Sequence, residues 1–209
     1  MKLTLNALAT ALLISTSASA LAASTVDLTV QGVITPNACT PGLSGSGVVD
    51  YGKISAKDLN LTTVTQLPRT TLQLTITCEG GTLFAIKGTD NRAGSNSSAG
   101  GYGLGLINGT QKLGAYDVVL LNAVADSGAV SVLESMDNGI TWSDSADAIL
   151  PVNALGAFGD KSSGVWLPVS IQQVTTDLLV YGQIARADSL DLSDEHPIDG
   201  SATFEVKYL

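Results

Sequence analysis

The sequence has few aromatic residues, a single histidine and about half as many basic residues as acidic ones. Phe, Trp and Tyr make up 5% of the 209 residues, and 10 Lys and Arg stand against 19 Asp and Glu. Nucleic acids and anionic membrane surfaces are bound by clusters of positive charge. The composition therefore argues against both as partners.

No stretch after residue 22 is long and apolar enough to cross a bilayer as a helix. The first 22 residues instead combine Lys2, an apolar run over 3–14 and a small-residue stretch that ends in Ala20-Leu21-Ala22. This three-part pattern is typical of a secretory signal peptide. We expect residues 1–22 to be removed and the mature chain, residues 23–209, to be exported. Without Lys2, 9 basic residues remain against 19 acidic ones, a net charge of −10.

The chain has only two cysteines, Cys39 and Cys78. In an exported protein an even pair of cysteines predicts a disulfide. A zinc site is the rival interpretation, but two thiolates and one distant histidine do not complete a tetrahedral set. We therefore expect a Cys39–Cys78 bond and no metal.

Sustained 3.6-residue periodicity is also missing, so we expect little helix. Segments rich in Val, Ile, Leu and Thr alternate with turn residues, which is typical of a β-sandwich or barrel. The pattern predicts strands over residues 24–35, 47–54, 70–78, 83–88, 165–174 and 177–187. It predicts hairpins at Asn108-Gly109 and at Asp137-Asn138-Gly139, and leaves 145–164 ambiguous, with room for a helical turn. No repeat or linker divides residues 23–209, which we expect to be one domain.

The last stretch has the clearest strand pattern of the chain. Ala202, Phe204, Val206 and Tyr208 alternate with Thr203, Glu205 and Lys207. Strict alternation predicts a half-buried strand at a position where chains usually fray.

Candidate chemistry is sparse. His196 lies in "LSDEHPIDG" with no evident partner, and no G-x-S-x-G motif indicates a nucleophilic serine. The acidic residues between 188 and 199 lack the spacing of an EF-hand loop and are interpreted as a solvated connection. The glycine-rich run over 100–109 leads into a hairpin, whereas a phosphate cradle opens a helix. We expect no enzyme, no metal site and no cofactor.

The two ends of the mature chain resemble pilins, the structural subunits of chaperone–usher fimbriae. Pilins show a V-x-G-x-I pattern leading to a cysteine, a second cysteine that ends the next strand, and an alternating C-terminal strand with a penultimate tyrosine. The layout also resembles a family of fimbria-associated exported proteins with a domain of unknown function. Residues 90–165 match neither. The matching residues are Val30, Gly32, Ile34, Cys39, Cys78, Phe204, Val206 and Tyr208.

The resemblance implies an immunoglobulin-like β-sandwich with one disulfide and inserted hairpins. A pilin lacks its last strand and exposes a groove, which a periplasmic chaperone and then the next subunit complete by strand addition. Phe204, Val206 and Tyr208 would then line the acceptor groove. Val26, Leu28 and Val30 would form the candidate donor strand. The implied partners are a periplasmic chaperone, an usher and other fimbrial subunits, and the implied location is the periplasm and then the cell-surface fimbria.

A second interpretation stays open, because only residues 23–31 precede Gly32. Nine residues are too few for both a full donor strand and a separate first strand. The chain would then be a self-contained secreted adhesive or carbohydrate-binding sandwich that does not polymerise. Trp142 and Trp166 are its candidate ligand contacts, although tryptophans are more often buried.

Overall fold

The computed structural model describes residues 28–32, 37–145 and 149–209. The chain divides into two units, residues 1–34 and a β-rich body over residues 35–209. Residues 28–32 of the first unit form neither strand nor helix, so the predicted 24–35 strand is wrong there. The predicted signal peptide, residues 1–22, and the candidate donor residue Val26 lie outside the described residues.

The first sheet of the body contains the longest strands, and all its ladders are antiparallel. Its order is β1-β3-β14-β8-β5, with β2 beside β14 and β9 beside β8. The bounds are Cys39–Leu43 for β1, Thr65–Gln66 for β2, Thr70–Thr82 for β3, Tyr102–Gly103 for β5, Gly114–Ala125 for β8, Gly128–Ala129 for β9 and Ile171–Ile184 for β14.

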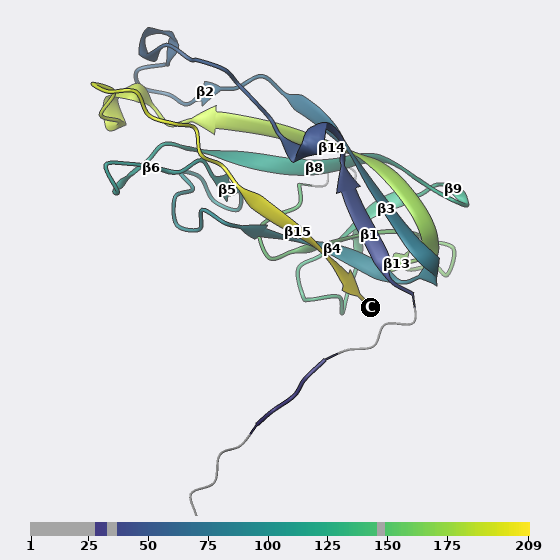
Figure 1. Cartoon of the computed structure of the whole chain (residues 1–209). Helices are drawn as coiled ribbons and strands as arrows, with labels where there is room; N and C mark the ends of the chain where they lie inside the picture. The colour runs from purple at the N-terminus through teal and green to yellow at the C-terminus, as the bar shows by residue number, and fades with distance from the viewer. Residues whose placement is uncertain (1–27, 33–36, 146–148) are drawn as a thin grey trace, which may run out of the picture. The chain divides into compact units, whose positions relative to one another are not determined.

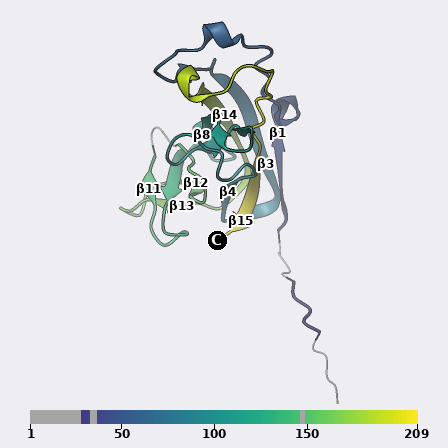
Figure 2. The ribbon, with the colours of Figure 1, turned by 90° about the vertical axis from the view of Figure 1, so that its left-hand side faces the viewer.

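The second sheet has the order β11-β10-β12-β4-β15, with β13 beside β12. In Figure 2, β11, β12 and β13 lie on one side of the body and β1 on the other. The strands span Phe84–Asp90 for β4, Ser131–Ser135 for β10, Ser143–Asp144 for β11, Leu155–Asp160 for β12, Leu167–Pro168 for β13 and Ala202–Tyr208 for β15.

Short elements complete the body. A small hairpin pairs β6 (Leu106–Ile107) with β7 (Gln111–Lys112). Three 3-10 turns, η1 (Ser44–Gly47), η2 (Ala56–Asp58) and η3 (Ala187–Ser189), lie in the connections. The described residues contain no α-helix. The all-β prediction is therefore confirmed.

The core lies between the inner faces of the two sheets. Along β3, Leu72, Leu74, Ile76 and Cys78 are buried and the alternate residues are more exposed, as their alternation predicts. Together with side chains of the second sheet they form one buried cluster. Within this cluster Phe84 and Phe158, both of the second sheet, pack edge to face with ring centroids 6.3 Å apart. This arrangement is a β-sandwich.

The second sheet is also covered on its outer face. Ala85, Leu133, Leu155 and Ala157 form a separate buried cluster there, and Trp142 and Trp166 pack against it. The tryptophans therefore act mainly as a cover for this sheet, which explains why their side chains are only partly exposed.

The disulfide is confirmed. Cys39 opens β1 and lies directly opposite Cys78 in the antiparallel ladder with β3, and the two sulfurs are bonded. The bond therefore fastens an edge strand to a long strand inside the first sheet.

Both predicted hairpins are present, although their loops differ in length. Asn108 and Gly109, both at positive φ, turn the β6–β7 hairpin, and residues 136–142 join β10 to β11. The ambiguous stretch 145–164 contains the strand β12, and its described residues form no helical turn. The two strands expected over 165–187 are replaced by β13 and the single long strand β14, because the Val174–Val180 region pairs without a break with β3.

Candidate functional site

Two edge strands face each other along one side of the body, β1 of the first sheet and β15 of the second. β15 pairs with β4 through seven residues, and β1 pairs with β3 through five. Among the described residues, no strand pairs with the other edge of either. Figure 1 shows the two running side by side in opposite directions. An unpaired edge exposes backbone N–H and C=O groups that can bind a further strand.

An apolar groove of about 250 Å³ lies between these edges. We call it the edge groove. Leu43 from β1 and Phe204 from β15 form its walls, and buried core residues such as Leu72, Tyr116 and Leu178 form its floor. Burial, with a smaller effect of the nearby Asp90 carboxylate, raises the pKa of Tyr116, so this residue stays a neutral part of the floor.

The predicted strand over residues 47–54 is wrong, but its alternation has a structural meaning. Val49 and Tyr51 are half-buried and line the edge groove, while Asp50 and Gly52 are exposed. The segment 48–55 is not part of a β-ladder. Side chains of residues 49–52 therefore alternate between the groove and solvent as in a strand, although the segment pairs with no strand among the described residues.

The predicted acceptor residues all lie in β15, but they occupy different surroundings. Phe204 and Val206 are half-buried and pack against the core, and Phe204 lies beside the buried Tyr102 with ring centroids 6.2 Å apart. Only Phe204 of the three lines the edge groove directly. Tyr208 is 38% exposed, and its hydroxyl accepts a 3.0 Å hydrogen bond from the backbone N–H of Cys39. Tyr208 thus joins β15 to β1 at one end of the groove, which we call the cysteine end.

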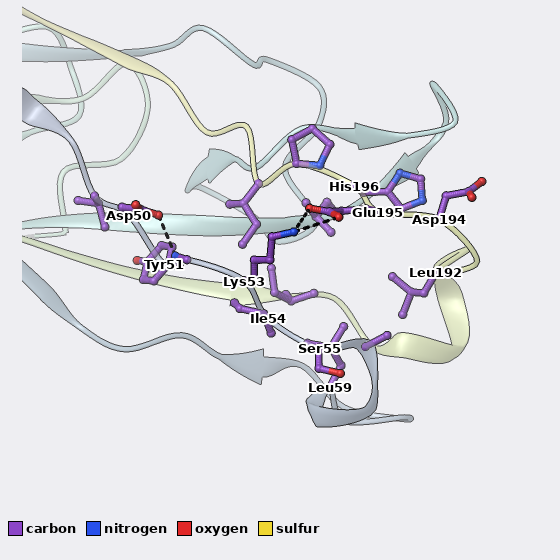
Figure 3. A pocket seen from close by; sticks show the side chains of 17 residues that line it. Asp50, Tyr51, Lys53, Ile54, Ser55, Leu59, Leu192, Asp194, Glu195 and His196 are labelled. Carbon is purple, nitrogen blue, oxygen red and sulfur yellow. Dashed lines mark hydrogen bonds and ion pairs between the residues drawn. The ribbon is translucent and has the colours of Figure 1, made fainter.

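Next to the other end of the groove lies a larger cavity of about 610 Å³, which we call the end cavity (Figure 3). Val49, Tyr51 and Ile198 line both spaces, so the two are adjacent. Figure 3 shows the loops that carry Asp50–Ser55 and Leu192–His196 on its sides. The buried Leu113 and Ile184 lie at its base.

Polar groups of the end cavity are mostly at its rim. Lys53 and Glu195 form an ion pair of 3.1 Å, but their side chains are 87% and 81% exposed, so the pair contributes little stability. Asp50 accepts a hydrogen bond from the backbone of Gly52, and Asp194 is exposed. Asp50 and Asp194 leave the rim acidic.

Two polar atoms deeper in the cavity wall have no hydrogen-bond partner within the described part of the chain. They are the Tyr51 hydroxyl and Nε2 of His196, and burial raises the pKa of Tyr51. His196 is only partly exposed and lies at the cavity. Among residues 37–145 and 149–209, Nε2 of His196 accepts or donates no hydrogen bond, and the same residues hold no group of three potential metal ligands.

The candidate donor residues Leu28 and Val30 are 87% and 85% exposed. Alternating apolar side chains directed to solvent carry a cost, because burying each one against another surface would contribute about 1.5–3 kcal/mol. No helix in the described ranges is long and apolar enough to cross a membrane.

Comparison with known proteins finds one matching family model and two similar proteins. Residues 28–104 match the family model described as "Protein of unknown function (DUF1120)". The chain is 29% identical to "Protein GltF" of Escherichia coli (strain K12), over 92% of each chain. It is also 29% identical to "Uncharacterized protein YhcF" of the same organism, over 91% of this chain and 93% of the relative. The matched region spans both cysteines, β1, β3 and β4, but ends long before β15.

Sequence reasoning missed the opposite wall of the groove and its floor. Tyr116 and Leu178 read as ordinary core residues, because a pattern of alternation does not show which core side chains lie below an open edge. The alternation of Val49 and Tyr51 with Asp50 and Gly52 was the available signal for the groove-facing side of this segment.

Proposed function

We propose that this protein is a non-enzymatic structural or minor subunit of a chaperone–usher-type fimbria, exported and assembled by β-strand complementation to support surface adhesion. The observation that carries the proposal is the free edge of β15 facing β1 across an apolar groove. An exposed apolar groove beside an unpaired strand edge favours aggregation unless another strand fills it. A periplasmic chaperone, an usher and other fimbrial subunits are the partners of such an edge.

The groove supplies both parts of a strand-binding site. The backbone of β15 offers hydrogen bonds to an added strand, and the apolar floor offers space for alternate side chains of that strand. The matching donor would carry apolar residues two apart. Val26, Leu28 and Val30 have this spacing, and the described ones, Leu28 and Val30, are exposed.

The test uses the mature chain, residues 23–209, and a fluorescent peptide with the sequence of residues 23–36. We expect the peptide to bind, with a rise in fluorescence anisotropy, and we expect Leu28→Asp in the peptide to weaken binding at least tenfold. Thr29→Asp is the matched control, because it adds the same charge on the opposite side of the donor strand. Since both changes lie in the peptide, neither alters the fold of the acceptor.

The alternative, a self-contained adhesive sandwich, is favoured by one contact, the Tyr208–Cys39 hydrogen bond that already joins the two edges. A chain of that kind would be monomeric, would unfold in a single transition and would leave the peptide unbound. This combination of results would reject the fimbrial proposal.

A further inference from the structure

The segment over residues 48–52, which we call the strap, is held to the body mainly by two side chains. Val49 and Tyr51 pack against the main core cluster and line the edge groove. Among the residues that the structure describes, no backbone–backbone hydrogen bond joins residues 49–52 to another segment. The Asp50 carboxylate accepts a 2.8 Å hydrogen bond from Gly52, which stays within the strap (Figure 3). A segment held in this way opens at a low free energy.

Glycines in the left-handed conformation lie at both ends of the strap. Gly47, directly before it, has a φ of 71°, and Gly52, its last residue, has a φ of 62°. Glycine adopts either sign of φ readily, because it has no Cβ. Hinges in proteins are a few loop residues that absorb a change of φ and ψ. The two glycines therefore allow the four residues between them to move away from the groove as one piece.

The fit of the strap to the body is imperfect at Tyr51. Its hydroxyl lies near Gly182 of β14, since a Cβ added to this glycine would be 3.6 Å from the hydroxyl oxygen. The oxygen is buried and has no hydrogen-bond partner within the described ranges. A buried hydroxyl without a partner costs free energy, which is recovered when the hydroxyl reaches water. Apolar burial therefore stabilises the closed strap, and the Tyr51 hydroxyl opposes it.

The edge groove is too small for the whole donor segment while the strap is in place. The groove measures about 250 Å³. A cavity of about 150 Å³ holds one benzene molecule, so the groove has room for about two apolar side chains. The candidate donor carries three, Val26, Leu28 and Val30. Val49 and Tyr51 lie in the wall beside this space and have the same two-residue spacing as the donor side chains.

We infer that the strap is a displaceable stand-in for the donor strand. Val49 and Tyr51 keep the edge groove partly filled before assembly, and they move out when residues 23–31 of a second copy enter. This inference rests on the proposed strand complementation and adds its regulation. Because strap and donor compete for the same space, only molecules with an open strap bind the donor. A partly filled groove also exposes less apolar surface to unspecific association.

The first test measures the affinity of the fluorescent 23–36 peptide for variants of the mature chain. Tyr51→Ala should raise the affinity about tenfold, because the strap no longer closes the groove in most molecules. Tyr51→Phe should lower it about threefold, because the closed strap no longer buries an unpartnered hydroxyl. Tyr181→Ala is the matched control, since it removes the same side chain from the other face of β14, where the ring lies beside Arg69. An unchanged or lower affinity of Tyr51→Ala would overturn the inference.

The second test follows the strap itself. The two cysteines of the chain are bonded to each other, so one introduced cysteine supplies a unique thiol. Val49→Cys should react slowly with a maleimide in the free chain and several-fold faster when the 23–36 peptide is bound. Val48→Cys, at a position that is 64% exposed, is the control and should react at similar rates in both states. Slower or unchanged labelling of position 49 in the complex would show that the strap stays in place.

The two proposals fail in different ways. If the peptide binds neither the unmodified chain nor the Tyr51→Ala chain, strand complementation fails. If it binds the two with equal affinity, strand complementation stands and only the displaceable strap fails. Binding to the Tyr51→Ala chain alone would support both, because the strap would then close the groove in nearly all unmodified molecules.

Discussion

The Tyr208 hydroxyl lies 3.0 Å from the backbone nitrogen of Cys39, a residue 169 positions earlier in the chain, and accepts its hydrogen bond. This contact joins the last strand of one sheet to the first strand of the other, beside the disulfide. It explains how a strand at the end of the chain is kept from fraying. It also makes the cysteine end the closed end of the edge groove.

Tyr208→Phe should lower the free energy of unfolding by about 0.5–1 kcal/mol, because it removes one partly exposed hydrogen bond and keeps the ring. Urea denaturation would measure the loss. Hydrogen exchange should also speed up at the Cys39 amide. An unchanged exchange rate there would show that the contact does not protect the amide in solution.

Tyr51→Phe should raise the free energy of unfolding or leave it unchanged. The Tyr51 hydroxyl is buried without a partner among the described residues, so its removal relieves an unsatisfied polar group. The ring that lines the groove stays in place. Equilibrium denaturation should measure the free energy of unfolding of both Tyr51→Phe and Tyr208→Phe. Each variant loses only a tyrosine hydroxyl, so the two values can be compared directly. A clear loss of stability would indicate that the hydroxyl has a partner in solution, such as a bound water.

Replacing both cysteines by alanine should lower the free energy of unfolding by about 2–4 kcal/mol, because the bond closes a long loop in the unfolded chain. The midpoint in urea would report this loss. Reduction of the unmodified protein should give a similar shift, and a much smaller one would mean that packing of Cys78 in the core dominates.

Gly88→Ala should disturb the core beneath β15. A Cβ at this position would overlap the hydroxyl of Tyr102, a fully buried residue that donates a 3.1 Å hydrogen bond to the Leu150 carbonyl. Overpacking of this kind costs about 1–3 kcal/mol. Gly42→Ala in β1 is the matched control, since its Cβ would meet nothing closer than 4.0 Å. Thermal unfolding of the two variants should separate them clearly.

Asp137, in the loop between β10 and β11, accepts hydrogen bonds from the Ser135 hydroxyl and from the backbone and hydroxyl of Thr141, and this network predicts a dependence of stability on pH. Hydrogen bonds, first of all those from Thr141, lower the pKa of Asp137 to about 2 in the folded protein. The unfolded chain therefore binds the proton more readily, and stability from this group is complete above pH 4 and is lost as the pH falls from about 4 to about 2. Asp137→Asn should reduce stability at pH 7 and flatten this part of the curve. Melting temperatures between pH 2 and pH 7 would show whether the two profiles converge at low pH.

The sequence alone predicted most of the strands near the groove. It also predicted the disulfide. Residues 70–78 and 202–208 alternate between apolar and polar side chains, so a strand formed by either stretch has one apolar face. This holds for any choice of neighbouring strands. The cysteine pair could be assigned because the chain offers only one pairing. The first inference needs only the order of residues along the chain, and the second needs only the number of cysteines. The sequence contains both.

The tertiary structure decided where the edges lie. Residues 49–52 and 202–208 both alternate, yet only the second stretch forms a ladder, because pairing depends on whether another strand reaches that edge. The groove between Leu43 and Phe204, and the end cavity between residues 49–56 and 192–198, bring together segments that are distant in sequence. The alternation of a strand shows which face it buries, but only the folded chain shows which edge it leaves free.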